Sequence, residues 1–202
     1  MEEYNNQEIL PAESVSYDAL LSKWIRFLLP VQIAGIVLSV ISEFQILPTL
    51  MSIAAQGLGI CVIVALFQMA PANSHYKTAA ILRCVSVGGG LLVLLAGSNL
   101  FTLVISVCSI ISAYQEYKGH SMVVAERDPQ LSHKWSTLFI WQLVVGVLTG
   151  FFTFAATVIG VLTGISAVTL ISVVLIVTTL VSACVQVFYV LYLKKMQLYF
   201  SV

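Results

Sequence analysis

Polar side chains inside apolar stretches are the residues of this sequence best suited to recognise a ligand. Gln32, Gln56, Gln142 and Gln186 each lie in such a stretch. An amide donates and accepts hydrogen bonds, so in an apolar medium it can bind a polar solute or join two helices. Joining helices is the simpler interpretation. A polar binding pocket made by Gln32, Gln56 and Gln142 is the alternative, and it requires that the three amides face one another.

Covalent catalysis has weak support in the sequence. The nearest pairing of a nucleophile with a base is Cys84 with His75. Their separation of nine residues turns an α-helix by about 900°, which places the two side chains on opposite faces. The H-E-x-x-H pattern of zinc proteases is absent, as is a phosphate-binding glycine loop. We predict that the chain is not an enzyme and has no catalytic residues.

The cysteines and histidines do not show the spacing of a metal site. All four cysteines fall in apolar runs without a C-x-x-C pair. His120 and His133 are expected to be solvated side chains of a loop, and a metal or pH-sensing role is the alternative. We therefore predict neither a metal site nor a cofactor. The cysteines are Cys61, Cys84, Cys108 and Cys184.

The composition indicates a protein whose solvent is lipid. Hydrophobic residues make up 59% of the 202 residues and charged residues only 9%, and the mean hydropathy is +1.01. Soluble chains carry roughly 25% charged residues. The formal net charge is zero, which argues against nucleic-acid binding. Residues 1–15 contain four glutamates and no Lys or Arg, so we expect an acidic tail and no cleavable leader.

The lengths of the apolar regions predict six membrane spans, because each crossing needs about 20 apolar residues. Turn-forming residues divide the regions near 43–48, 97–99 and 160–166. We predict an all-α polytopic integral membrane protein with six transmembrane helices in three hairpins, and with residues 16–202 as a single transmembrane domain. The predicted spans are 24–42, 49–70, 78–96, 100–117, 136–159 and 166–193.

Charge predicts the orientation of this bundle. With six spans, all nine Lys and Arg residues lie on or near one side, and the three opposite turns contain none. By the positive-inside rule that side is cytoplasmic, so both termini are predicted inside the cell. The short outer turns favour a bacterial plasma membrane. Trp and Tyr, which prefer the membrane interface, gather near the same boundary: Trp24, Tyr76, Tyr114, Tyr117, Trp135, Tyr189 and Tyr192.

No ionisable residue is predicted at the middle of the membrane. Arg83 lies about five residues into the third span, and we expect its long side chain to reach back to the interface. Pro30 removes one helix hydrogen bond and predicts a kink in the first span. A proton-coupled mechanism is therefore not expected, because its usual intramembrane carboxylates are missing.

The longest polar segment is 116–135, which we predict to be a cytoplasmic loop. Within it, Asp128 followed by Pro129 has the character of a helix cap and a first-turn proline, which predicts that the fifth helix begins there and enters the membrane near Trp135.

Two hypotheses for function remain. The first is a non-catalytic permease or substrate-binding subunit of a transport system, which works with other membrane subunits or a cytoplasmic ATPase. The second is a membrane scaffold, sensor or assembly factor that binds a partner through the 116–135 loop, with Arg127, His133 and Lys134 as the contact residues.

Overall fold

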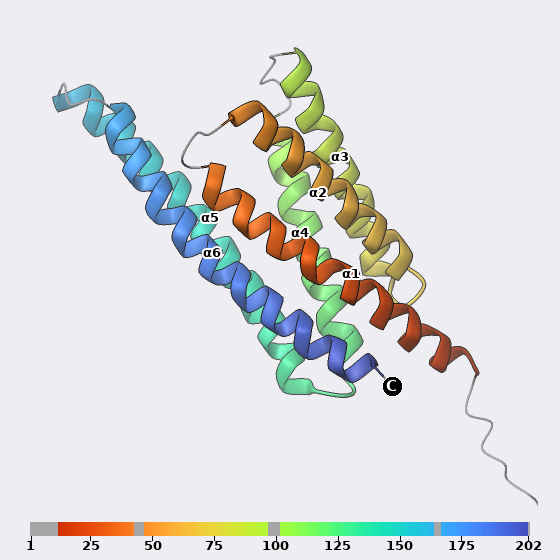
Figure 1. Cartoon of the computed structure of the whole chain (residues 1–202). Coiled ribbons are helices and arrows are strands. Elements are labelled where there is room, and N and C mark those ends of the chain that lie inside the picture. The colour runs from red at the N-terminus through yellow and green to blue at the C-terminus, as the bar shows by residue number, and fades with distance from the viewer. Residues whose placement is uncertain (1–11, 43–46, 97–101, 164–166, 202) are drawn as a thin grey trace, which may run out of the picture.

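The computed structural model describes residues 12–42, 47–96, 102–163 and 167–201, and within these ranges the regular structure is all helical. The six helices follow the predicted apolar segments closely. Residues 1–11 of the acidic tail and the turn at 97–99 lie outside the described residues. The helices in Figure 1 are α1 (Ala12–Ser42), α2 (Pro48–Met69), α3 (Ser74–Ala96), α4 (Thr102–Val124), α5 (Pro129–Thr163) and α6 (Ala167–Phe200).

Five of the described helices are long and apolar enough to cross a membrane, as a helical membrane protein requires. The exception is α4, whose last half contains Glu116, Lys118 and His120 and is correspondingly more polar. Several predicted helix ends are changed, among them the ends of α4 at Val124 and of α6 at Phe200. α1 begins at Ala12 and runs through Pro30, and α5 continues through Gly160 to Thr163. Both helices are therefore longer than the spans predicted from apolar residues.

The polar segment 116–135 is not the loop that we predicted. α4 continues to Val124 and α5 starts at Pro129, which leaves only residues 125–128 between them. The predicted cap is confirmed, because Asp128 Oδ1 accepts a hydrogen bond from the backbone N–H of Leu131 at 2.9 Å. This satisfies one of the free donors of the first helical turn.

The helices are arranged as a ring in the order of the chain. Each packs against the helices that precede and follow it, and α1 closes the ring by packing against α6. The connections 70–73 and 125–128 lie at the same end of the bundle as the start of α1 and the end of α6 (Figure 1). We call this the basic end, because the described Lys and Arg side chains gather towards it.

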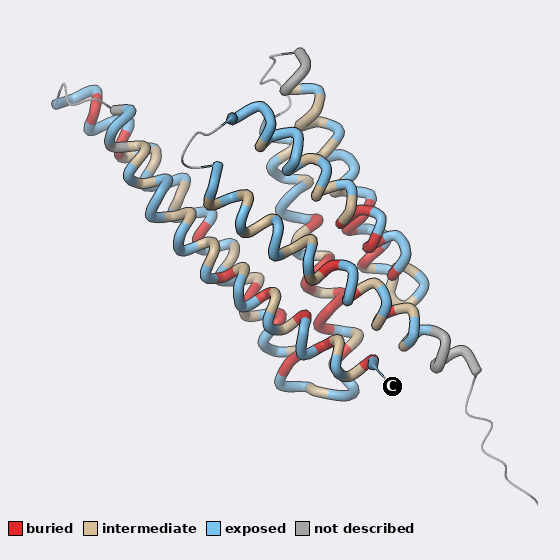
Figure 2. Tube along the Cα trace, in the orientation of Figure 1, coloured by how far each residue is buried: buried red, intermediate tan, exposed pale blue. Residues whose placement is uncertain are grey.

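Buried side chains concentrate towards the basic end. In Figure 2 the buried positions cluster on the half of the bundle that includes the end of α6, while exposed positions dominate the opposite half. The core there combines residues of all six helices, including Ile25 of α1, Leu66 of α2 and Leu193 of α6, none of which is exposed. The ring is thus tightly packed at one end, and that end holds the polar residues described next.

Candidate functional site

A connected chain of polar side chains is buried among α3, α4 and α6. The hydroxyl of Tyr76 lies 2.9 Å from Nδ1 of His120, and Nε2 of His120 lies 3.1 Å from the hydroxyl of Tyr189. Tyr189 in turn donates a hydrogen bond to Oε1 of Glu116. Glu116 also forms an ion pair with Arg83. We call these five residues the polar chain.

The number of protons that each group can donate determines the direction of the hydrogen bonds in the polar chain. A hydroxyl has a single proton to donate, and that of Tyr189 is directed at Glu116. The oxygen of Tyr189 therefore accepts from Nε2–H of His120. In a neutral imidazole Nδ1 is then an acceptor, so Tyr76 donates to it. All three protons therefore point towards Glu116.

In the ion pair at the end of the polar chain, the glutamate is nearly removed from solvent and the arginine is partly exposed. Arg83 Nη2 lies 3.1 Å from Glu116 Oε2, and the two side chains are 24% and 2% exposed. Oε2 has no aligned hydrogen-bond donor among the described residues, so this contact is electrostatic. Arg83 thus pairs with the neighbouring helix, and its reach to the membrane interface stays a prediction. An isolated buried carboxylate would be costly, and the guanidinium reduces that cost.

Aromatic rings surround the imidazole of His120. The ring of Trp135 lies 4.7 Å from that of His120, and those of Trp135 and Tyr189 are 5.1 Å apart, between centroids. His120 is fully buried, so it is not the solvated side chain that we predicted, and Trp135 is fully buried beside it. The indole Nε1 of Trp135 is buried without a hydrogen-bond partner within the described ranges. The surroundings of the polar chain are therefore largely apolar.

Small residues let α3 approach α4 beside the polar chain. A Cβ added to Gly119 would lie 2.8 Å from the ring of Tyr76. The hydroxyl of Ser112 donates to the backbone carbonyl of Ala79 at 2.8 Å. These contacts fix the Tyr76 ring where its hydroxyl meets His120, so packing and hydrogen bonding support the same geometry.

The pairing of His75 with Cys84 is not formed. Both residues lie in α3, and His75 Nδ1 is instead within hydrogen-bond distance of Oε1 of Gln115 in α4. Cys84 is exposed. Within the described ranges no group of three or more His, Cys, Asp or Glu side chains gathers as metal ligands would.

A second polar cluster joins the chain segments that meet at the basic end. Arg127 binds the carboxylate of Asp18 in α1 and, at 2.7 Å, the backbone carbonyl of Tyr199 in α6. Asp128 accepts hydrogen bonds from Lys195 at 2.7 Å and from the hydroxyl of Tyr199 at 2.8 Å. The hydrogen bond from Lys195, followed by that of the Leu131 backbone N–H, lowers the pKa of Asp128 well below its ordinary value.

The three amides of the predicted binding pocket are distributed over the ring. Gln56 of α2 lies against α3, where its Nε2 is 2.9 Å from the position of an added Cβ on Gly90. Gln142 of α5 lines a groove of about 360 Å³ with residues of α4, and its Oε1 is buried without a hydrogen-bond partner among the described residues. No hydrogen bond between described residues joins either amide to Gln32. The shared pocket remains a prediction.

The residues of the predicted partner-binding segment have different surroundings. Arg127 is held by α1 and α6 through the contacts given above. His133 and Lys134 lie in the first turns of α5 and are exposed.

Sequence reasoning assigned Glu116 and His120 to a solvated loop and missed the polar chain. The signal that could have revealed it is the spacing of Ser112, Glu116 and His120, which recur every four residues and therefore share one face of a helix. On α3, Tyr76 and Arg83 are seven residues apart and share a face in the same way.

Comparison with known proteins gives no relationship for this chain: no family model, no curated protein sequence and no solved structure matches it. The structure itself shows a helical bundle with a buried polar chain near its basic end.

Proposed function

We propose that this protein is a non-catalytic permease or substrate-binding subunit of a transport system. The observation that carries the proposal is the buried pair of Arg83 and Glu116 with the polar chain attached to it. Ionisable residues inside helical membrane bundles are costly, and they commonly mark the paths of ions or polar substrates.

The position of the polar chain supports a role in passage. Its residues come from α3, α4 and α6, which are not all neighbours in the ring, so their hydrogen bonds reach across the bundle. They do so where the core is densest. A solute crossing between the helices at this end would have to separate or replace these hydrogen bonds. Glu116 and Arg83 offer one charge of each sign for that exchange.

The proposal includes a topology. The chain crosses a bacterial plasma membrane six times, as three hairpins with both termini in the cytoplasm. Its support is that the start of α1, the connections 70–73 and 125–128 and the end of α6 lie together at the basic end. A basic end faces the cytoplasm under the positive-inside rule.

Energy for concentrative transport would come from a partner, because the sequence contains no phosphate-binding glycine loop. We expect a cytoplasmic ATPase or a second membrane subunit. The test is affinity purification of the tagged full chain from native membranes in mild detergent, followed by quantitative mass spectrometry, with an unrelated membrane protein as control. Stoichiometric recovery of an ATPase or permease supports the proposal; recovery of a regulator, an envelope enzyme or no protein contradicts it.

A second candidate function is a scaffold, sensor or assembly factor acting through the 116–135 segment. The exposure of His133 and Lys134 favours it. Arg127 is engaged within the chain, so His133 and Lys134 carry this hypothesis. Reversing the charge of Lys134 and replacing His133 should then abolish partner recovery without affecting membrane insertion. Unchanged recovery counts against the scaffold.

A further inference from the structure

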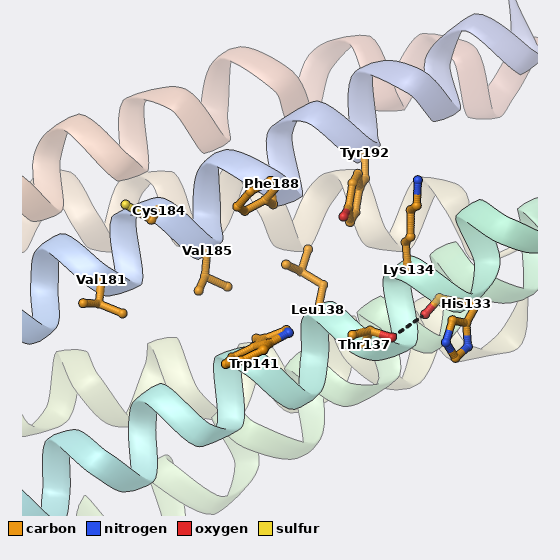
Figure 3. Close-up of a pocket in the computed structure, with 10 residues that line it drawn as sticks. All are labelled: His133, Lys134, Thr137, Leu138, Trp141, Val181, Cys184, Val185, Phe188 and Tyr192. Carbon is orange, nitrogen blue, oxygen red and sulfur yellow. Dashed lines mark hydrogen bonds between the residues drawn. The ribbon is translucent and has the colours of Figure 1, made fainter.

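A groove runs along the surface between α5 and α6, with a volume of about 540 Å³. Figure 3 shows its apolar walls, formed by residues such as Trp141 and Leu138 on α5 and by Val185 and Phe188 on α6. Lys134 and His133 lie together at one end, on the side of Tyr192, and Val181 lies at the other. The groove is therefore amphipathic along its length, with its cationic end towards the basic end of the bundle.

The rim of the groove faces away from the core of the ring, whereas Leu138 and Val185 in its lining are buried and belong to that core. Lys134 and Phe188 directly precede Trp135 and Tyr189, which are buried around His120. One residue turns an α-helix by about 100°, so Lys134 and Phe188 point to another side of each helix than Trp135 and Tyr189 do. Trp141 and Phe188 are 58% and 51% exposed. In a bilayer these side chains would meet lipid and not the polar chain.

The dimensions suit a lipid acyl chain. Tyr192 and Val181 are 11 residues apart on α6, which corresponds to a rise of about 16 Å. Half the thickness of the hydrocarbon core is about 15 Å. A chain that entered beside Tyr192 could therefore follow the groove to roughly the depth at which its own leaflet ends.

The positive charge of Lys134 at one end of the groove favours a lipid with an anionic headgroup. Lys134 is exposed and forms no ion pair with a described residue. Lysines that do pair at this end, such as Lys195 with Asp128, lie outside the groove. We propose that the groove binds an anionic glycerophospholipid, with one acyl chain between α5 and α6 and the headgroup phosphate at the Lys134 ammonium. His133 lies at the same end of the groove.

Trp141 provides a direct probe of this site. The full chain is reconstituted into bilayers that contain brominated phosphatidylglycerol or brominated phosphatidylcholine, whose bromines quench a neighbouring indole. The fluorescence of a Trp141→Phe variant is subtracted to remove the signals of the other two tryptophans. Competition against unbrominated phosphatidylcholine then gives the relative affinity of the groove for each lipid.

We expect phosphatidylglycerol to be preferred about fivefold in the original protein, since one lysine near an anionic lipid surface contributes roughly that factor. Lys134→Gln should abolish the preference, so that the two lipids bind with a ratio of about one. The matched control is Lys194→Gln, which removes an exposed lysine of the same end that does not line the groove. Its preference should stay unchanged.

Three results would overturn the assignment. The first is equal quenching by the two lipids in the original protein, which would indicate nonspecific lipid contact. The second is an equal loss of preference in Lys194→Gln and Lys134→Gln, which would indicate a general surface charge effect. The third is a retained preference in Lys134→Gln. Quenching by phosphatidylcholine in each variant reports that the groove is intact, so misfolding is separated from loss of headgroup binding.

Discussion

Arg83 in α3 and Glu116 in α4 pair at 3.1 Å, and the glutamate side chain is almost inaccessible while about a quarter of the arginine side chain is exposed. The two partners therefore differ in what their removal leaves behind. Loss of Arg83 leaves a buried anion, whereas loss of the Glu116 charge leaves a cation that can still reach solvent.

This asymmetry predicts unequal effects on stability. Arg83→Met should lower the free energy of unfolding by roughly 3 kcal/mol, as expected when a buried pair loses one member. Glu116→Gln should cost less, because its amide oxygen can still accept the hydrogen bond of Tyr189. Unfolding in mixed detergent micelles measures both. The double variant should be more stable than Arg83→Met alone; a purely additive result would show that the pair is not coupled.

The direction of hydrogen bonding in the polar chain predicts that loss of the Tyr189 hydroxyl lowers stability more than loss of the Tyr76 hydroxyl. Tyr189→Phe removes a donor to Glu116 and an acceptor for His120, whereas Tyr76→Phe removes one donor to His120. Each net hydrogen bond contributes about 1 kcal/mol, so Tyr189→Phe should destabilise by about twice as much as Tyr76→Phe. The same unfolding assay compares them. Equal effects would mean that His120 does not donate to Tyr189.

Gly119 should tolerate no side chain. In Gly119→Ala the new methyl group would press on the Tyr76 ring, which is fully buried. Overpacking of this kind costs about 1 to 3 kcal/mol. Gly150→Ala is the matched control, since a Cβ there meets nothing within 4 Å. It should be neutral or stabilising by up to about 1 kcal/mol through helix propensity. Thermal unfolding of the two variants would contradict the prediction if Gly119→Ala were as stable as the control.

The lowered pKa of Asp128 predicts that the folded protein loses stability in acid. Its pKa is lowered in the folded protein relative to about 3.9 in the unfolded chain. A lowered carboxyl pKa stabilises the fold at neutral pH, and that contribution disappears as the pH falls below about 4 towards the folded pKa. Asp128→Asn keeps a good helix cap but loses the charge. Its unfolding should depend less on pH in this window. An unchanged pH profile would assign the acid sensitivity to other groups.

The sequence was sufficient for the helices but not for the site. Apolar length and turn-forming residues predicted each of the described helices, because membrane thickness imposes that length. Many helix ends were also predicted to within a few residues, whereas α1, α4 and α6 extend further at one end. Pro129 marked the start of α5 for an equally local reason, the cap at Asp128. Glu116 and His120 were misassigned because their burial depends on which faces of α3, α4 and α6 meet. Helix rotation is decided by tertiary packing, which a single sequence does not state.

The closure of the ring by α1 and α6 determines the order in which contacts between the helices form during synthesis. Asp18 of α1 meets Arg127 only after 109 further residues of chain, and α6, the second neighbour of α1, comes later still. During synthesis α1 therefore has only α2 beside it while the rest of the bundle emerges. Contacts between residues so distant in sequence form slowly because a long loop must close first. Joining α1 to α6 is then a late step of assembly, and α1, which leaves the ribosome before the other five described helices, is among the last to find all its partners.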